Sequence, residues 1–167
     1  MGLSAAALGV LRGTGYVVPS GRERTLSALA WWQYLVVAHV ARRITAPDEL
    51  GAAPAAGLPT SDELDVAGFI DQRLVAMRPK VRGDLLSFIG IVEHVSPIAK
   101  GHARRFSNLA PAEQDAVLAS LESSGSDLMR AGFEGLKALV FMGYYRDPRT
   151  WAVLGYEGPW VRAKGGS

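Results

Sequence analysis

The sequence contains no cysteine. This absence excludes disulfide bonds, thiolate metal sites, cysteine-ligated iron–sulfur clusters, covalent c-type haem attachment and a cysteine nucleophile. Histidine is scarce as well, with three residues, His39, His94 and His102. No two of them have the i, i+4 spacing that places paired ligands on one face of a helix. The sequence therefore predicts no metal site.

An excess of charge of one sign is also lacking. Charged residues make up 20% of the chain and the formal net charge is +2. Nucleic-acid-binding proteins have a stronger basic footprint, and disordered acidic tails have a larger imbalance of charge. The one strongly apolar N-terminal run, Gly2–Leu11, is too short to span a bilayer. We therefore expect no nucleic-acid partner and no transmembrane span.

The known cofactor and nucleophile motifs are missing too. No Gly-x-Gly-x-x-Gly follows a strand, no Gly-x-Ser-x-Gly elbow is present, and no segment shows convincing strand alternation. The chain itself is therefore predicted to carry no FAD, no NAD and no other cofactor.

Residues 1–24 form an Ala-rich arm. The run Gly2–Leu11 has the small, apolar composition of the hydrophobic region of a signal peptide. It resembles the part of a twin-arginine signal that follows the arginine pair, although no such pair precedes it here. Two interpretations stay open, a remnant of an export signal and an ordinary arm or first helix.

Apolar residues at spacings of three and four predict an all-α fold. A length of 167 residues with 49% hydrophobic residues suits one domain with a real core. We expect an irregular bundle of about five to six helices over residues 25–160, then a flexible tail over residues 161–167. The main helices are expected at 25–44, 61–78, 81–95, 111–122 and 127–144, with further turns at 100–106 and after Pro148.

Aromatic residues gather near the C-terminus among glycines and prolines, over a stretch that cannot be one helix. Aromatics on irregular backbone often anchor interfaces. The residues predicted to contact a partner are Trp31, Trp32, Tyr144, Tyr145, Trp151, Tyr156 and Trp160. The competing interpretation is a tail that wraps its own core, with Trp151 and Leu154 folding back on the bundle.

A small enzymatic site is the third possibility. Glu93 and His94 near the end of one helix, with His102 shortly after it, could act as an acid–base pair. Isolated histidines at helix ends are more often structural, and His39 on an apolar helix is typical of a satisfied core histidine. We predict no catalytic residue in this chain.

Two ordered motifs in the second half of the chain carry a family resemblance. The first is Arg105-Phe106 followed by Leu109-Ala-Pro-Ala-Glu-Gln114, with Leu118 and Leu121 behind it. The second is the run Tyr144-Tyr-Arg-Asp-Pro-Arg-Thr-Trp-Ala-Val-Leu-Gly-Tyr-Glu-Gly-Pro159. Residues 104–160 thereby resemble subunit 3, the gamma or small subunit, of gluconate 2-dehydrogenase. Ala110 stands where the family usually has a capping serine.

The resemblance implies an accessory subunit that is not an enzyme by itself. Such subunits accompany a large FAD-containing oxidoreductase of the glucose–methanol–choline class, often with a cytochrome c subunit that carries haem c. The implied role is to bind, stabilise and help mature or export that flavoprotein. The implied location is the periplasm or the periplasmic face of the inner membrane, with the cytoplasm as the alternative. A free-standing helical interaction or tethering domain is the rival function.

Overall fold

The computed structural model describes residues 16, 25–46 and 57–156, except for the side chains of residues 152 and 153. Within these ranges the chain forms six α-helices and two 3-10 helices, and no strand. The helices are α2 (Trp31–Ile44), α3 (Val66–Val75), α4 (Pro79–His94), α5 (Ser96–Ala99), α6 (Pro111–Glu122) and α7 (Asp127–Tyr144), with η1 (Phe106–Asn108) and η2 (Pro148–Leu154). The predicted all-α fold is confirmed. The arm other than Tyr16, Trp160 and the tail at 161–167 lie outside the described residues.

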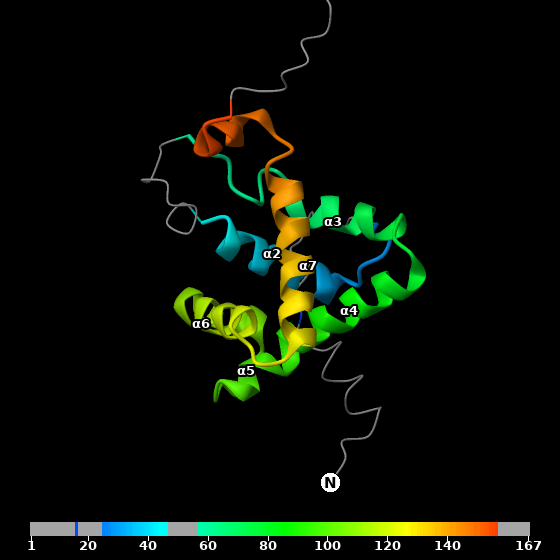
Figure 1. Cartoon of the computed structure of the whole chain (residues 1–167), viewed down its shortest axis with the longest axis vertical. Helices are drawn as coiled ribbons and strands as arrows, with labels where there is room; N and C mark the ends of the chain where they lie inside the picture. The colour runs from blue at the N-terminus through cyan, green and yellow to red at the C-terminus, as the bar shows by residue number, and fades with distance from the viewer. Residues whose placement is uncertain (1–15, 17–24, 47–56, 157–167) are drawn as a thin grey trace, which may run out of the picture.

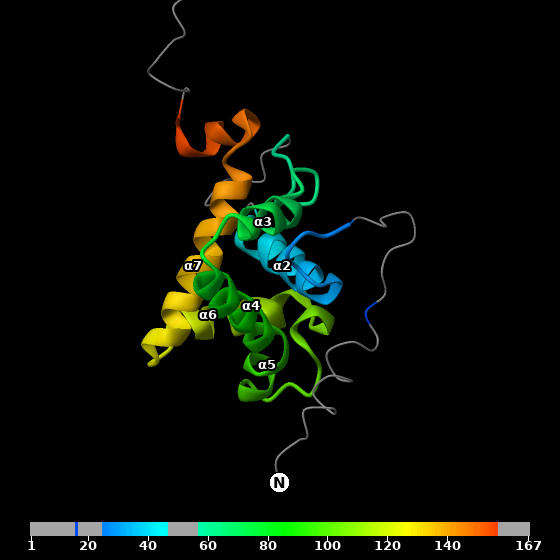
Figure 2. The same ribbon diagram turned by 90° about the vertical axis from the view of Figure 1, so that its right-hand side faces the viewer.

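Helix α7 is the central element of the bundle (Figure 1). It packs against α3 and α4 on one side and against α6 on another, while α2 contacts α3, α4, α6 and α7. The view at right angles shows α2 and α4 crossing beside α7, with α5 continuing beyond the end of α4 (Figure 2). Some connections are short, as expected where sequential helices are neighbours: Val95 alone separates α4 from α5, and residues 123–126 separate α6 from α7.

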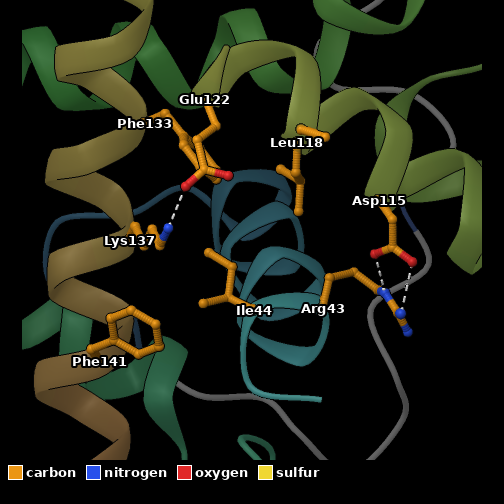
Figure 3. Close-up of a pocket in the computed structure, with 9 residues that line it drawn as sticks. Arg43, Ile44, Asp115, Leu118, Glu122, Phe133, Lys137 and Phe141 are labelled. Atoms are coloured by element: carbon orange, nitrogen blue, oxygen red, sulfur yellow. Dashed lines mark hydrogen bonds and ion pairs between the residues drawn. The ribbon is translucent and has the colours of Figure 1, made fainter. Parts of the chain in front are cut away.

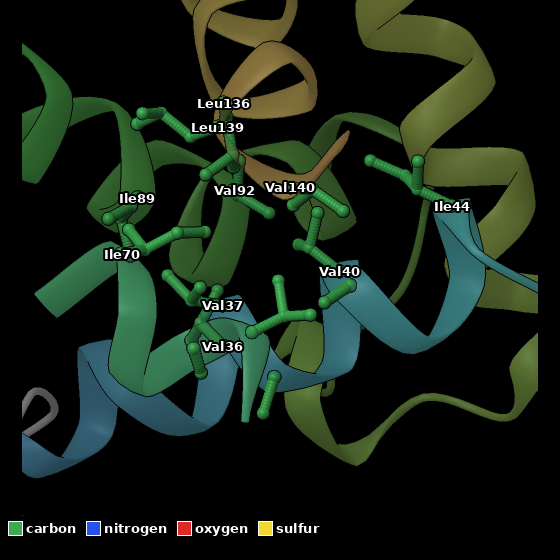
Figure 4. Close-up of a cluster of buried hydrophobic side chains, with 14 of the residues drawn as sticks. Val36, Val37, Val40, Ile44, Ile70, Ile89, Val92, Leu136, Leu139 and Val140 are labelled. Atoms are coloured by element: carbon green, nitrogen blue, oxygen red, sulfur yellow. The ribbon is translucent and has the colours of Figure 1, made fainter. Parts of the chain in front are cut away.

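One hydrophobic core lies where α2, α3, α4 and α7 meet (Figure 4). Its side chains are mostly branched aliphatics that pack without polar atoms. The fully buried members include Val36, Val37, Val40, Ile70, Ile89, Val92, Leu136 and Val140, each 0% exposed. Burying one such side chain stabilises the fold by about 1.5–3 kcal/mol. The core therefore holds α2, α3 and α4 against α7.

Helix α2 begins six residues later than the sequence predicts, at Trp31 instead of Thr25. The buried carboxylate of Asp71 on α3 accepts hydrogen bonds from the backbone N–H groups of Ser27, Ala28 and Leu29, at 2.8, 2.9 and 2.8 Å. These three bonds hold residues 27–29 in an irregular segment ahead of the helix, because Asp71 supplies the acceptor that their N–H groups need. The predicted helical start was therefore wrong because a distant side chain holds the backbone.

Helix α3 also starts later than predicted, at Val66 instead of Ser61. Residues 61–65 form turns, and Thr60 and Glu63 cap them reciprocally: Glu63 accepts from the Thr60 N–H at 2.7 Å, and Thr60 Oγ1 accepts from the Glu63 N–H at 3.1 Å. Asp65 then takes a left-handed backbone with φ 47° and accepts from the Gly68 N–H. Aspartate tolerates this conformation better than most residues, so it can end the turn and cap the helix.

The middle of the chain follows the prediction with shifted boundaries. Helix α4 begins at Pro79, because proline suits the first helical turn, and it ends at His94. Pro97 lies within the short α5. The turns expected at 100–106 are instead found as η1, which begins at Phe106.

Helices α6 and α7 have the bounds that the sequence predicts. Pro111 occupies the first turn of α6, and Glu113 accepts a hydrogen bond from the Ala110 N–H at 2.7 Å. Alanine at position 110 cannot supply the other half of a capping box, so one backbone donor loses its usual side-chain partner. The N-terminus of α6 nevertheless forms where expected.

Gly132 and Gly135, two small residues of α7, differ in what surrounds them. A Cβ atom on Gly132 would lie 2.4 Å from Cδ2 of Phe88, so α4 approaches α7 closely at this position. A Cβ atom on Gly135 would meet nothing within 4 Å. Gly132 therefore lets α4 and α7 approach closely, whereas Gly135 faces open space in the single chain.

Candidate partner-binding surface

The C-terminal aromatics form a connected cluster that extends from the end of α7 into η2. The rings of Phe141 and Tyr145 have centroids 5.7 Å apart, and those of Trp151 and Tyr156 are 5.1 Å apart in an edge-on arrangement. Trp151 Nε1 donates to the Tyr145 carbonyl at 2.8 Å, which fixes η2 against the end of α7. Tyr156 is 41% exposed. We call Phe141, Tyr145, Trp151 and Tyr156 the C-terminal aromatic cluster.

Two expectations for this region need correction. Tyr144 is 1% exposed, and its hydroxyl donates to the Pro59 carbonyl at 3.0 Å. Burial raises the pKa of this phenol above its ordinary value. The side chain thus belongs to the chain's own core and has no surface to offer a partner. Leu154, expected to fold back on the bundle, is 55% exposed, because the 3-10 turn that seats Trp151 directs Leu154 outward.

The start of η2 is fixed by a local ion pair. Asp147 Oδ1 accepts from Arg149 Nε and from the Arg149 N–H, at 2.9 and 3.0 Å. These hydrogen bonds from Arg149 lower the pKa of Asp147 to about 2. Asp147 therefore caps the turn that Pro148 begins.

Trp31 and Trp32 lie in the first turn of α2 and are both half-buried. Trp31 packs edge-on against Tyr34, with ring centroids 5.4 Å apart. Trp32 lies between Tyr16 and His94, at centroid distances of 6.2 and 5.6 Å. Each indole therefore keeps part of its surface outward, but neither lies in the C-terminal aromatic cluster.

A pocket of about 290 Å³ opens between α2, α6 and α7 (Figure 3). Its apolar lining comes from Ile44, Leu118, Phe133 and Phe141. Two ion pairs flank it. Arg43 makes a forked pair with Asp115, at 2.6 and 2.8 Å, and Lys137 pairs with Glu122. Because each cation is matched by an anion, the pocket is suited to an apolar or amphipathic side chain of a partner. Phe141 connects it to the C-terminal aromatic cluster.

A larger groove, of about 610 Å³, runs between α4 and the first part of α7. We call it the α4–α7 groove. Its lining is almost entirely apolar and includes Leu85, Phe88, Ile91 and Leu139. No sequence signal distinguishes these open apolar residues from core residues, because both have helical spacing.

The three residues considered for an acid–base site each contact other partners. Glu93 is 0% exposed and accepts from the Ser107 N–H at 3.0 Å and from the Ser107 hydroxyl at 2.7 Å. It also accepts from the Tyr16 hydroxyl at 2.7 Å. His102 instead faces Glu113, with 3.6 Å between Nδ1 and Oε1, and His94 packs on Trp32.

The Glu93 carboxylate is thus the centre of a structural polar cluster. Arg105 completes it, with Nε 3.9 Å from Glu93 and the guanidinium 4.2 Å from the centre of the Tyr16 ring. Burial, followed by the hydrogen bond to Glu93, raises the pKa of Tyr16 above its ordinary value. The cluster attaches η1 and Tyr16 to α4. Sequence reasoning missed Ser107 and Tyr16, since neither has a motif that indicates a distant buried carboxylate.

His39 occupies the half-buried structural position that the sequence predicts. Its Nδ1 lies 3.2 Å from the Gln114 amide nitrogen, which also donates to the Phe106 carbonyl at 3.0 Å. An amide donor at Nδ1 favours the neutral ring with its proton on Nε2. Burial, helped by the nearby Arg42, lowers the pKa of His39 below its ordinary value. His39 therefore links α2 to α6.

Two general findings concern the described part of the chain. Within it, no group of three or more His, Asp or Glu side chains is arranged to hold a metal ion. None of its helices is long and apolar enough to cross a membrane.

Comparison with known proteins places the chain in a family. No match was found among curated proteins or among solved structures. The family model for gluconate 2-dehydrogenase subunit 3 matches residues 33–158 of the 167-residue chain. The match begins in α2, so the likeness extends well before the motifs at 104–160 that first indicated it. The chain belongs to the gluconate 2-dehydrogenase subunit 3 family.

Proposed function

We propose that this chain is a non-catalytic small subunit that binds and stabilises a large FAD-dependent alcohol or sugar dehydrogenase of the glucose–methanol–choline class. The family match over residues 33–158 carries the proposal, because the family consists of dehydrogenase subunits. In such a complex the large subunit holds FAD and oxidises a hydroxyl group by hydride transfer to the flavin. A cytochrome c subunit then accepts the electrons.

The surface of the chain supports a role in binding a partner. The pocket beside Phe141 and the C-terminal aromatic cluster are continuous, and Met142 and Leu154 near them are 48% and 55% exposed. Exposed aromatic and apolar side chains around a hollow are typical of interface cores. Expressed without its partner, the chain should therefore be less soluble than in the complex, and co-expression should raise its soluble yield.

The first experiment is co-expression of the affinity-tagged chain with the products of its neighbouring genes, any candidate flavoprotein among them. The expected result is a yellow complex with flavin absorbance and dehydrogenase activity. A colourless, monodisperse monomer, obtained while the flavoprotein is soluble in the same cells, would contradict the proposal and favour the free-standing interaction domain.

A paired substitution tests the contribution of the aromatic cluster. Tyr156→Ala removes a 41% exposed ring and should weaken the complex. Tyr144→Phe removes one hydroxyl from a ring that is 1% exposed and should leave binding unchanged while lowering thermal stability. Equal weakening by both variants would argue against a direct contact at Tyr156.

The enzymatic alternative is tested on the complete complex. The double variant His94→Ala, His102→Ala removes both imidazoles of the candidate acid–base site. Under the proposal the turnover number of the complex is retained once the complex has assembled. A loss of turnover with an unchanged amount of bound flavin would give this chain a chemical role.

Maturation and export are the finer part of the proposal. The small subunit is proposed to accompany the flavoprotein to the periplasm or the periplasmic face of the inner membrane, with the cytoplasm as the competing location. Fractionation of cells that express the flavoprotein with and without this chain tests the idea. Activity in the periplasmic fraction should depend on the presence of this chain.

A further inference from the structure

Helix α7 has a second apolar side that the single chain leaves open. Leu128, Ala131, Gly135, Ala138 and Met142 follow one another at alternating spacings of three and four residues. Leu128 is 71% exposed and Met142 is 48% exposed, and the three small residues between them are exposed as well. We call these five residues the α7 stripe. Alternating spacings of three and four are how one helix presents a seam to another helix.

Helix α4 supplies a second wall beside the α7 stripe. The α4–α7 groove includes Leu128, Ala131, Gly135 and Ala138 of the stripe together with Val81, which is 51% exposed. Exposed apolar residues on both walls make the groove a continuous apolar surface, larger than the scattered single residues usual on a monomer. The groove and the stripe therefore share four residues and form one surface.

The shape of this surface fits a helix. At a rise of 1.5 Å per residue, the stripe from Leu128 to Met142 is about 21 Å long, or roughly four turns. Its central residue, Gly135, faces open space, since a Cβ atom there would meet nothing within 4 Å. Small residues at the centre of a seam let the backbone of a second helix approach closely.

The charges around the groove favour a partner helix over a second copy of the chain. On the α4 rim, Lys80 pairs with Asp84 at 3.0 Å, so this rim contributes no net charge. On the other flank of the stripe are the exposed Asp127 and Glu134, of which Asp127 pairs with Arg130. Two antiparallel copies of α7 crossing at Gly135 would place their Glu134 carboxylates on the same flank, close together, and like charges would repel.

We propose that the α4–α7 groove binds one amphipathic helix of the large dehydrogenase subunit. The apolar seam of that helix packs on the α7 stripe, and a basic residue on its flank faces Glu134. This inference rests on the proposed function, because it takes the large subunit as the partner.

Cysteine labelling tests the location directly, because the chain has no cysteine of its own. Gly135→Cys places one thiol in the groove, and Gly83→Cys is the matched control. Both are exposed helical glycines at which a Cβ atom meets nothing within 4 Å, and Gly83 does not line the groove. A polyethylene-glycol maleimide is added to the isolated chain and to the complex, and the mass shift of this chain is followed. Assembly should slow labelling at Gly135→Cys by about tenfold or more, as expected for a buried site, and leave Gly83→Cys unchanged.

A charge substitution tests the same surface through affinity. Ala138→Glu places a carboxylate in the α7 stripe, and Ala116→Glu places one on an exposed position of α6 outside both hollows. Ala138→Glu should weaken the complex by about a hundredfold, because the charge would be buried without a partner. Ala116→Glu should bind like the unmodified chain, and both variants should retain the unfolding temperature of the isolated chain.

The outcomes separate this inference from the proposed function. If the complex forms but Gly135→Cys labels equally fast with and without it, the groove is not the contact, while the proposed function stands. If the isolated chain sediments as a dimer in which Gly135→Cys is protected and forms a disulfide with its copy, the occupant is a second copy and the inference is overturned. If the unmodified chain forms no complex with the flavoprotein, both proposals fail.

Discussion

The two sides of α7 differ in what their apolar residues do. On the inner side, Leu136, Val140 and Tyr144 are 0%, 0% and 1% exposed and hold α7 in the core. On the outer side, Leu128 and Met142 are 71% and 48% exposed. Both sets have helical spacing in the sequence, so periodicity alone cannot distinguish them. The comparison teaches that α7 carries more apolar surface than this chain buries, and the surplus is concentrated on one side.

Truncating one large side chain on each side of α7 should give the largest difference in the free energy of unfolding. Leu136→Ala leaves a cavity in the core and should lower the free energy of unfolding by about 2–5 kcal/mol. Met142→Ala, on the exposed side, should change it by roughly 0.5 kcal/mol or less. Chemical denaturation of the two isolated variants measures the difference, and similar losses would mean that the outer side is also packed in solution.

The buried carboxylate of Asp71 tests how much a polar contact inside the bundle contributes to stability. Asp71→Asn removes the charge that accepts three backbone hydrogen bonds from residues 27–29. The free energy of unfolding should fall by about 1.5–3 kcal/mol. Amide hydrogen exchange should become faster first at Ser27, Ala28 and Leu29. Uniform loosening of the bundle without faster exchange at these amides would contradict the assigned role.

The two glycines of α7 test the same contrast between its two sides, with smaller expected changes in stability. Gly132→Ala forces its new Cβ against Phe88, which is 4% exposed and cannot move freely, and should destabilise the chain by about 1–3 kcal/mol. Gly135→Ala meets open space and should stabilise the isolated chain by up to about 1 kcal/mol through helix propensity. Thermal unfolding of both variants tests the opposite signs. Destabilisation by Gly135→Ala would show that a neighbour already covers this position.

The smallest expected effect is a pH dependence at His39. Its folded-state pKa lies below the ordinary 6.5, so the neutral ring is favoured in the native state. Its contribution to stability is therefore complete above pH 6.5 and declines as the pH falls from there toward the folded-state pKa. His39→Gln should flatten this part of the curve of unfolding free energy against pH. NMR titration of the ring measures the pKa itself, and a value above 6.5 would contradict the assignment.

Much of the fold could be predicted from the sequence because the signals were local. The bounds of α6 and α7 follow from Pro111, the acids beside it and the apolar spacing of each helix. The candidate surface was predictable in part. Tyr145, Trp151 and Tyr156 do gather, but Tyr144 shares their sequence environment and is buried because its hydroxyl reaches the Pro59 carbonyl. No local pattern distinguishes the buried tyrosine from its neighbour.

The sequence by itself determined the all-α character, most helix positions and the family of this protein, since periodicity, proline placement and motif order act over a few residues to a few turns. The tertiary structure alone decided where α2 begins, that Glu93 is structural, and which glycine of α7 is packed. Asp71 lies 42 residues from Leu29, and Tyr16 lies 77 residues from Glu93. Contacts across such separations exist only once the helices have packed, because burial then makes an unpaired carboxylate or amide costly and thereby selects its partner.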